Sequence, residues 1–193
     1  MRWSVFLAVA ALAYVLGACG AERANRPSTT VRPGDPTRRV SYPRVGLSLA
    51  LPRNAFAQRR RSPGVFRAPV GQSFVAAFAY RRSEQLPRNR RELEAARRRL
   101  VREVNGRSRA FRLLSSRRTR VAGAPALELV GDQTIARSRL RTRSLHVFKG
   151  RGEYVIDMLA PVSEFPASNR NFFSPVVRSL RVTGRIPPSP RRG

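Results

Sequence analysis

The strongest hydrophobic pattern in the chain lies between residues 89 and 106, where apolar side chains recur at helical spacing. Asn89 can cap the start of a helix, and Glu92, three residues on, can reach back to complete the cap. Asn105 and Gly106 supply a left-handed stop. The pattern therefore predicts a helix with one apolar stripe, formed by Leu93, Ala96, Leu100, Val101 and Val104.

Apolar runs with the period of a strand lie on both sides of this helix. Before it, the run VGLSLALP (45–52) places its leucines on one face. The run QSFVAAFAY (72–80) is apolar on both faces, which is typical of a strand in the middle of a covered sheet. After the helix, four runs follow with connections short enough for hairpins, so we expect an antiparallel meander over about residues 110 to 122, 125 to 132, 137 to 149 and 153 to 160.

A second amphipathic segment follows the meander and carries Phe172, Phe173, Val176, Val177 and Leu180 at helical spacing. Pro175 lies within it, and a proline inside a helix removes a hydrogen bond and clashes with the preceding turn. We therefore expect a helix that begins near Ser174 or is kinked there. The order of elements predicts an α+β fold, in which an antiparallel sheet of about six strands is covered by two helices in a sandwich.

The two ends of the chain lack these patterns. Residues 1–18 combine a positive start, an apolar stretch and small residues, which is typical of a signal peptide. The apolar stretch is shorter than the ~20 residues that a membrane-spanning helix needs. Residues 19–40, rich in proline and polar side chains, are expected to be a disordered tether, residues 41–183 the folded domain, and residues 184–193 a disordered tail.

The end of the predicted signal peptide, Leu16-Gly17-Ala18-Cys19, contains the only cysteine of the chain. This tetrad resembles the lipobox of bacterial lipoproteins, and the resemblance implies that Cys19 is lipidated and becomes the first residue after cleavage. Two or three acyl chains would give stable anchoring, because a single chain binds a bilayer only marginally. The expected location is therefore the cell membrane, with the domain on the extracytoplasmic side. An ordinary signal peptide with an incidental cysteine remains the alternative.

Four further segments carry a resemblance to a known family: VGLSLALP, VAGAPALELVG (121–131), GRGEYVIDMLAP (150–161) and FFSPVVRSLRV (172–182). In this order and spacing they resemble the PsbP-like family, over most of residues 41–183. The resemblance implies a PsbP-like α/β/α sandwich. It also implies a binding or accessory role without a shared set of catalytic residues.

The charge of the chain limits its partners. Lys and Arg total 39 against 11 acidic residues, which gives a formal net charge of +28. The electrostatic field of so large a positive charge attracts polyanions. An exported protein would meet anionic lipid headgroups and envelope polymers. Nucleic acid is not an expected partner in the cell, and no protein partner is indicated. The candidate anion-binding residues alternate along one predicted strand, and a solvated outer face is the alternative reading: Arg137, Arg139, Arg141 and Arg143.

Catalytic chemistry has few candidate residues. His146 is the only histidine, and in its predicted strand it shares parity with Leu140, Thr142, Ser144 and Phe148, which indicates the same face. A histidine in such a strand is more often a hydrogen-bonded residue of the sheet than a catalyst, so we expect the former. Glu128 and Asp157 are expected to form ion pairs with arginines. No cofactor or metal is expected, because one histidine and a lipidated cysteine leave only scattered carboxylates as ligands. We expect a non-catalytic module; an exported, hydrolase-like enzyme using His146 and a nearby carboxylate remains the alternative.

Overall fold

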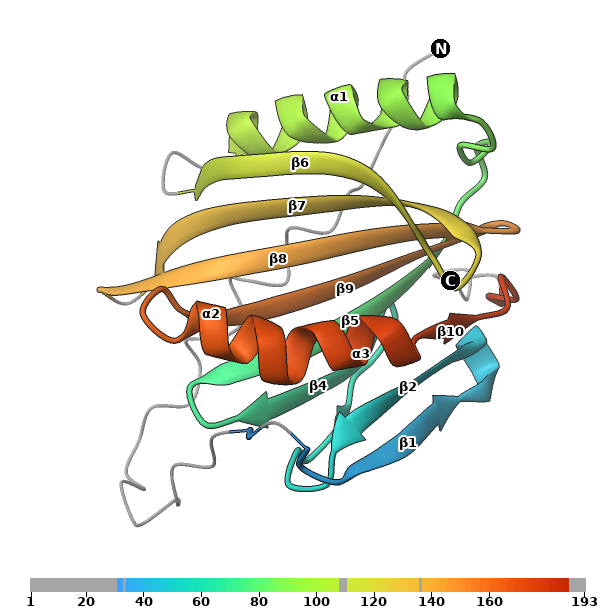
Figure 1. The fold of residues 1–193 in the computed structure, drawn as a ribbon. Coiled ribbons are helices and arrows are strands. Elements are labelled where there is room, and N and C mark those ends of the chain that lie inside the picture. The colour runs from blue at the N-terminus through green and yellow to red at the C-terminus, as the bar shows by residue number, and fades with distance from the viewer. Residues whose placement is uncertain (1–30, 33, 108–110, 136, 188–193) are drawn as a thin grey trace.

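The structure is a computed structural model that describes residues 31–32, 34–107, 111–135 and 137–187. The predicted signal peptide, the lipobox with Cys19 and residues 188–193 lie outside the described residues. The fold has two antiparallel sheets with helical segments on both faces of the larger one (Figure 1).

The larger sheet has seven strands in the order β3-β4-β5-β9-β8-β7-β6, and every neighbouring pair is antiparallel. Its last four strands form the expected meander. The strand that precedes the helix in the chain, β5, pairs with β4 and β9 and so lies in the interior of the sheet, next to the central strand β9. The strands are β3 (Gln58–Arg59), β4 (Gly64–Val70), β5 (Ser73–Arg81), β6 (Phe111–Val121), β7 (Ala124–Ile135), β8 (Ser138–Lys149) and β9 (Gly152–Pro161).

The expected single sheet of about six strands is corrected in two ways. The predicted strand at 45–52 lies in a second sheet, and β3 and β4, which belong to the large sheet, were not predicted. Pro63 precedes β4 and Pro69 lies within it, and prolines in an apolar run argue against a ladder strand. Strand β4 forms despite these prolines for two reasons. Phe66 and Ala68 lie in the core, at 1% and 0% exposure, and β5 pairs with β4 along almost the whole length of β4.

A second sheet of three strands has the order β1-β2-β10, formed by β1 (Thr37–Tyr42), β2 (Leu47–Pro52) and β10 (Arg181–Val182). A 3₁₀ turn, η2 (Pro43–Val45), joins β1 to β2. Strand β1 overlaps the end of the expected tether at 19–40, which is therefore too long. The sequence of β1 is polar because most of its side chains are exposed, so it shows no apolar alternation. The strand forms through backbone pairing with the whole length of β2.

The expected tail at 184–193 also begins too early. Gly184 and the residues up to Pro187 are described, and the Gly184 N–H donates to the Tyr154 hydroxyl at 3.1 Å. Gly184 has a φ of +80°, and a Cβ added there would lie 2.6 Å from the Lys149 carbonyl oxygen. The chain leaving β10 therefore packs closely against the β8–β9 turn.

Helix α1 (Arg90–Arg107) packs against β6 and β7 on one face of the large sheet (Figure 1). The other helical segment is continuous from α2 (Phe165–Ser168) through a π-helical turn, η3 (Asn169–Phe173), to α3 (Ser174–Ser179). It begins well before Ser174, where the sequence predicted a start or a kink. The π turn directly before Pro175 resolves the conflict, since its looser hydrogen-bond pattern lets the chain stay helical around a residue that lacks an N–H.

Two apolar clusters occupy the two faces of the large sheet. The larger cluster joins the sheet to α2, α3 and the small sheet, with Phe172 and Phe173 at 1% and 0% exposure. The smaller cluster lies under α1, where Leu93, Leu100 and Val104 meet Leu127, Leu129 and Phe148. Helix α1 packs mainly against β6 and β7 of this sheet. The same face of the neighbouring strands β8 and β9 carries polar residues that lie outside this cluster.

Candidate functional site

A pocket of about 320 Å³ opens between α1, the segment that links β5 to α1, and the large sheet. Its apolar wall is formed by Leu86, Ala96, Leu100, Leu127 and Phe148. Charged residues complete the lining: Arg82, Glu84, Glu92, Arg99 and Glu153. Pockets that bind small molecules combine apolar walls with a few fixed polar groups in this way.

The deepest polar groups of this pocket are a buried ion pair. Arg82, directly after β5, and Glu153, in β9, are 8% and 4% exposed, and the Arg82 Nε donates to Glu153 Oε2 at 2.6 Å. The Arg82 Nη2 contacts the same oxygen. The pairing of Arg81 with Gly152 at the end of the β5–β9 ladder places these two residues together. The pair thus joins segments far apart in the sequence.

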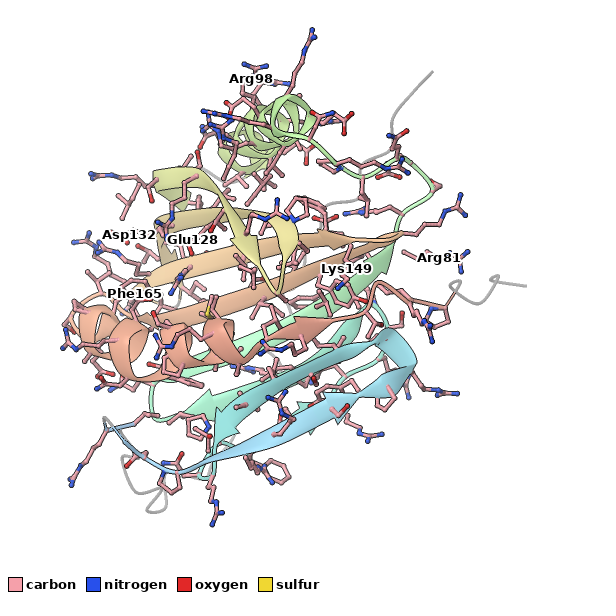
Figure 2. All side chains as sticks on the ribbon, turned by 45° about the vertical axis from the view of Figure 1, so that its right-hand side comes forward. Arg81, Arg98, Glu128, Asp132, Lys149 and Phe165 are labelled. Carbon is pink, nitrogen blue, oxygen red and sulfur yellow. The ribbon has the colours of Figure 1, made fainter. Side chains whose placement is uncertain are left out.

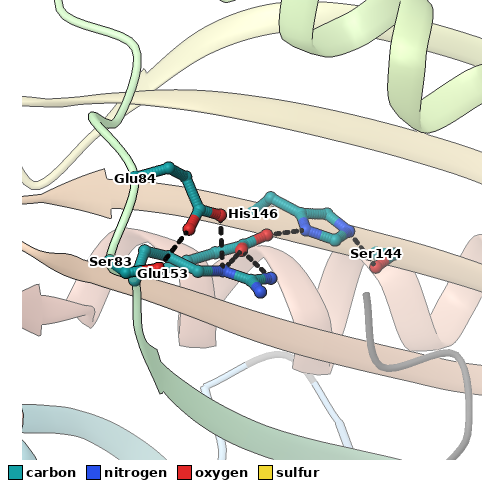
Figure 3. Close-up of polar contacts among 6 residues, drawn as sticks. Ser83, Glu84, Ser144, His146 and Glu153 are labelled. Atoms are coloured by element: carbon teal, nitrogen blue, oxygen red, sulfur yellow. Dashed lines mark hydrogen bonds and ion pairs between the residues drawn. The ribbon is translucent and has the colours of Figure 1, made fainter. Parts of the chain in front are cut away.

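From this ion pair a row of hydrogen bonds runs along the sheet (Figure 3). His146 Nδ1 lies 2.8 Å from Glu153 Oε1, and His146 Nε2 lies 3.3 Å from the Ser144 hydroxyl. The Ser144 hydroxyl in turn donates to Asp157 Oδ1 at 2.6 Å. Ser144 and Asp157 are direct cross-strand partners in the β8–β9 ladder, which accounts for their contact. We call Arg82, Glu153, His146, Ser144 and Asp157 the polar row.

The pKa values of the two carboxyl groups of the row are shifted in opposite directions. Burial opposes ionisation of Glu153, but the hydrogen bond with His146 and the charge of Arg82 outweigh it and lower the pKa of Glu153. Burial raises the pKa of Asp157, against a smaller lowering effect of Ser144. Burial, with the charges of Asp157 and Glu153, also raises the pKa of the nearby Tyr80. Glu153 is thus the stable anion of the row, and Asp157 is the group that favours a proton.

The directions of these hydrogen bonds follow from the ionised carboxylate of Glu153. Glu153 accepts from the His146 Nδ1–H, since an ionised carboxylate has no proton to donate. The Ser144 hydroxyl donates to Asp157 Oδ1, and its oxygen lies 3.3 Å from the His146 Nε2.

The contacts of Ser144, His146 and Glu153 resemble a nucleophile, base and orienting acid, yet the surroundings do not fit acyl transfer. The Ser144 hydroxyl donates its hydrogen bond to Asp157, so Asp157 competes with His146, the candidate base. Strand β8 lies between β7 and β9, so its backbone N–H groups are engaged in two ladders and none is left to stabilise an oxyanion. Of the row, Arg82 and Glu153 line the pocket, whereas His146, Ser144 and Asp157 are not among its lining residues.

The four predicted anion-binding arginines do not form one row of free cations. Arg141 pairs with Asp132 at 2.6 Å, and Arg143 pairs with Glu128 at 2.7 Å and reaches Asn169 in η3. Arg139 is mostly exposed and lies 3.6 Å from Asp132. Arg137 stands in the turn before β8 with a φ of +65°. Three of the four guanidinium groups thus face a carboxylate of the protein.

These ion pairs connect the meander to the second helical segment. Figure 2 shows Glu128, Asp132 and Phe165 on the same side of the molecule. The Arg141 guanidinium lies 5.6 Å from the centre of the Phe165 ring, and the Arg143 Nη1 donates to the Ser174 hydroxyl at 3.1 Å. The expected ion pairing of Glu128 is confirmed, by Arg143 and by Arg117 at 2.7 Å. The same expectation for Asp157 is wrong, because Asp157 accepts from Ser144 instead.

Sequence reasoning missed most of the polar row. The shared parity of His146 and Ser144 was visible, and their contact confirms it. Aligning the predicted hairpin around Gly150 would have set Asp157 opposite Ser144 and Glu153 beside His146. Arg82 carried no such signal, since its place depends on the long-range pairing of β5 with β9.

Two general features of the described residues bear on the site. Among them, no three His, Cys, Asp or Glu side chains gather closely enough to hold a metal ion. Within the same ranges, no helix combines the length and the apolar character needed to cross a bilayer.

Comparison with known proteins defines the class of fold. No protein-family model matches the sequence, and no curated protein matches it either. Among solved structures, the chain is similar to cyanobacterial PsbP (CyanoP) from Synechocystis sp. PCC 6803, with a TM-score of 0.59 at 12% identity, over 86% of this chain and 98% of that one. The structure therefore has a PsbP-like α+β fold, which confirms the expected fold class.

Two further solved structures share the fold. One is LpqN of Mycobacterium tuberculosis, described as involved in cell envelope biogenesis, with a TM-score of 0.53 at 12% identity, over 78% of this chain and 87% of that one. The other is the Ran-binding protein Mog1p of Saccharomyces cerevisiae, with a TM-score of 0.51 at 8% identity, over 77% of this chain and 96% of that one. At these identities the likeness concerns the fold alone.

Proposed function

We propose that the protein is a lipid-anchored, extracytoplasmic bacterial lipoprotein that acts as a non-catalytic binding or accessory module of the cell envelope. The observation that carries the binding role is the pocket between α1 and the sheet, with apolar walls and a floor fixed by the Arg82–Glu153 pair. The lipobox-like Leu16-Gly17-Ala18-Cys19 supports the anchor, through lipid attached to Cys19. The similar fold of LpqN, a protein involved in envelope biogenesis, supports the envelope as its place of action.

The lining of the pocket defines the class of ligand. An apolar body would pack between Leu100 and Phe148, and a polar end would meet the charged groups of Glu84, Glu92 and Arg99. Ala96 lies on α1 in the pocket wall, so a larger side chain there fills the space without removing a polar contact. Amphipathic molecules of the envelope, with an apolar body and a polar end, fit this description.

A pocket-filling variant tests the binding role. The probe is 1-anilinonaphthalene-8-sulfonate, which has apolar rings and one anionic group, added to the full chain carrying Cys19→Ser so that no lipid is attached. We expect Ala96→Phe to weaken probe binding by about tenfold through loss of the cavity. The matched control is Ala167→Phe, at an exposed position of α2, which should leave binding unchanged. Equal binding by all three chains would contradict a binding role for this pocket.

The alternative function is an exported enzyme of hydrolase type. It is favoured by one observation, the contact of His146 with both Ser144 and the carboxylate of Glu153. The variant His146→Gln keeps a donor for Glu153 and removes the base. The enzyme is favoured if His146→Gln folds but loses the cellular phenotype while Ala96→Phe keeps it. The opposite result, loss with Ala96→Phe alone, supports the binding module.

A further inference from the structure

A second pocket, of about 370 Å³, lies where the start of α1 meets the β6–β7 hairpin. Four arginines line it, two from the segment that enters α1 and two from β6: Arg88, Arg90, Arg118 and Arg120. Leu93, Thr119 and Pro125 lie among them, and no aromatic side chain is part of the lining. Arginines from two separate segments thus converge on one hollow of the surface.

The carboxylates near this pocket are already engaged elsewhere. Glu92 accepts from the Arg88 backbone N–H and from Asn89 Nδ2, each at 2.8 Å, and so serves the helix cap. Glu94 is held by Arg97, with contacts of 2.7 to 3.2 Å, and reaches Arg118 only at 3.4 Å. The charge of the four arginines is therefore largely uncompensated by the residues that the structure describes.

The guanidinium groups also keep donors available. Arg120 uses Nη2 to donate to the Gly123 carbonyl at 2.8 Å, which positions the side chain. The guanidinium groups of Arg88 and Arg90 form no hydrogen bond or ion pair within the part of the chain that the structure describes. A guanidinium has five donors in a planar fork, so several remain free to bind an oxyanion with two parallel hydrogen bonds.

The local structure fixes the backbone that carries these arginines before any ligand arrives. The Glu92 N–H donates to Asn89 Oδ1 at 2.9 Å, so the cap fixes the chain between Arg88 and Arg90. Arg118 and Arg120 are two residues apart on β6 and therefore project from the same face of the sheet, the face that α1 covers. Little ordering of the backbone is needed on binding, which favours affinity.

We infer that this pocket binds the phosphate group of a phosphomonoester or phosphodiester. Several donors can serve the oxygens of one tetrahedral phosphate, whereas a single carboxylate offers only two oxygens to four guanidinium groups. The lack of aromatic lining argues against single-stranded nucleic acid, whose bases stack on aromatic rings. The site is separate from the pocket of the proposed function, and each can be tested without the other.

The test compares two variants of equal charge, both made in the full chain carrying Cys19→Ser. The site variant replaces the four arginines with glutamine: Arg88→Gln, Arg90→Gln, Arg118→Gln and Arg120→Gln. The control removes the same charge from exposed arginines elsewhere: Arg53→Gln, Arg59→Gln, Arg61→Gln and Arg170→Gln. The probes are glycerol 3-phosphate, by calorimetry, and phosphatidylglycerol vesicles, by co-sedimentation, with acetate at equal ionic strength as the competing anion.

We expect the site variant to lose at least about tenfold in phosphate binding, because charge-assisted hydrogen bonds are among the stronger ones in proteins. The control should stay within about twofold, as general screening predicts for distant surface charges. Binding of glycerol 3-phosphate that depends on the site identifies a phosphate pocket. Site-dependent binding of vesicles without glycerol 3-phosphate assigns the phosphate to a membrane headgroup.

Three results would overturn the inference: equal loss in both variants, equal binding of acetate, or no binding of either phosphate probe. Circular dichroism checks that both variants fold. If the site variant does not fold, the double variant Arg88→Gln with Arg90→Gln decides, since both side chains are exposed. The double variant should show the same direction of change, and unchanged binding would contradict the assignment.

Discussion

The most informative single substitution is Glu153→Gln, because Glu153 is the centre of the polar row. Its carboxylate is 4% exposed and bonds to both Arg82 and His146, which are 8% and 5% exposed. Glutamine keeps the size and removes the charge, so Arg82 loses this buried counter-charge. Removing one partner of a buried ion pair costs about 3–5 kcal/mol of unfolding free energy. We expect a loss near the lower end, about 3 kcal/mol, because the glutamine oxygen still accepts one hydrogen bond.

Urea denaturation followed by circular dichroism measures this change. With a denaturant slope of about 2 kcal/mol per molar, the midpoint should fall by about 1.5 M. The control is Glu164→Gln, on the turn before α2, whose side chain makes no cap hydrogen bond and which should change the free energy by less than about 0.5 kcal/mol. A loss below about 1 kcal/mol for Glu153→Gln would refute the claim that the row is a buried, charged network.

The pH dependence gives a second check on the same variant. The pKa of Glu153 lies below its ordinary value of 4.5 in the folded protein, so the unfolded chain binds this proton more tightly. The stabilisation by Glu153 is therefore fully present above pH 4.5 and is lost as the pH falls through the folded pKa. The difference in stability between the wild-type chain and Glu153→Gln should shrink in that acidic range. A difference that stays constant down to pH 3 would contradict the charge assignment.

Two further predictions concern the same sheet. Burial raises the pKa of Asp157 above its ordinary value of 3.8. The contribution of Asp157 to the free energy of unfolding is therefore fully present below pH 3.8 and is lost as the pH rises through the folded pKa. Urea denaturation should accordingly show that the stability of Asp157→Asn, relative to the wild-type chain, increases between about pH 3 and pH 7. Gly131→Ala should cost about 1–3 kcal/mol in the same assay, because the added Cβ would meet the Phe111 ring and lie 2.9 Å from the Arg112 carbonyl oxygen. Gly106→Ala should instead stabilise by about 0.5–1 kcal/mol, because Gly106 lies within α1 with open space around it and not at the left-handed stop that the sequence predicted. Equal effects of the two alanines would contradict the close approach at Gly131.

The elements predicted best from the sequence were those with local signals. Helix α1 carried both an apolar stripe and a cap, and the Glu92 N–H donates to Asn89 Oδ1 as expected. The meander carried hairpin connections such as the one at Gly150, with a φ of +59°. Strand β1 and strand β4 carried neither, because their place depends on pairing with β2 and β5 rather than on their own composition.

The candidate site was predicted only in part, for the same physical reason. His146 was identified as a hydrogen-bonded residue of the sheet, and its contacts with Glu153 and Ser144 confirm this. The alternation of Arg137, Arg139, Arg141 and Arg143 indicated a strand, which is correct for the last three but not for Arg137 in the turn, and it gave no sign of the carboxylates opposite. Strand β7 supplies these carboxylates, Glu128 and Asp132, and only the register of the β7–β8 pair reveals that they neutralise the arginines.

Lipid attachment to Cys19 is the claim on which the proposed location and role most depend. Mass spectrometry of the N-terminal peptide, purified from membranes of the native host, tests it directly. We predict a chain that begins at Cys19 and carries acyl groups, and a Cys19→Ser chain that loses both the lipid and the membrane association. A mature N-terminus with an unmodified Cys19 thiol, or a wild-type chain recovered from the cytosol, would contradict the account.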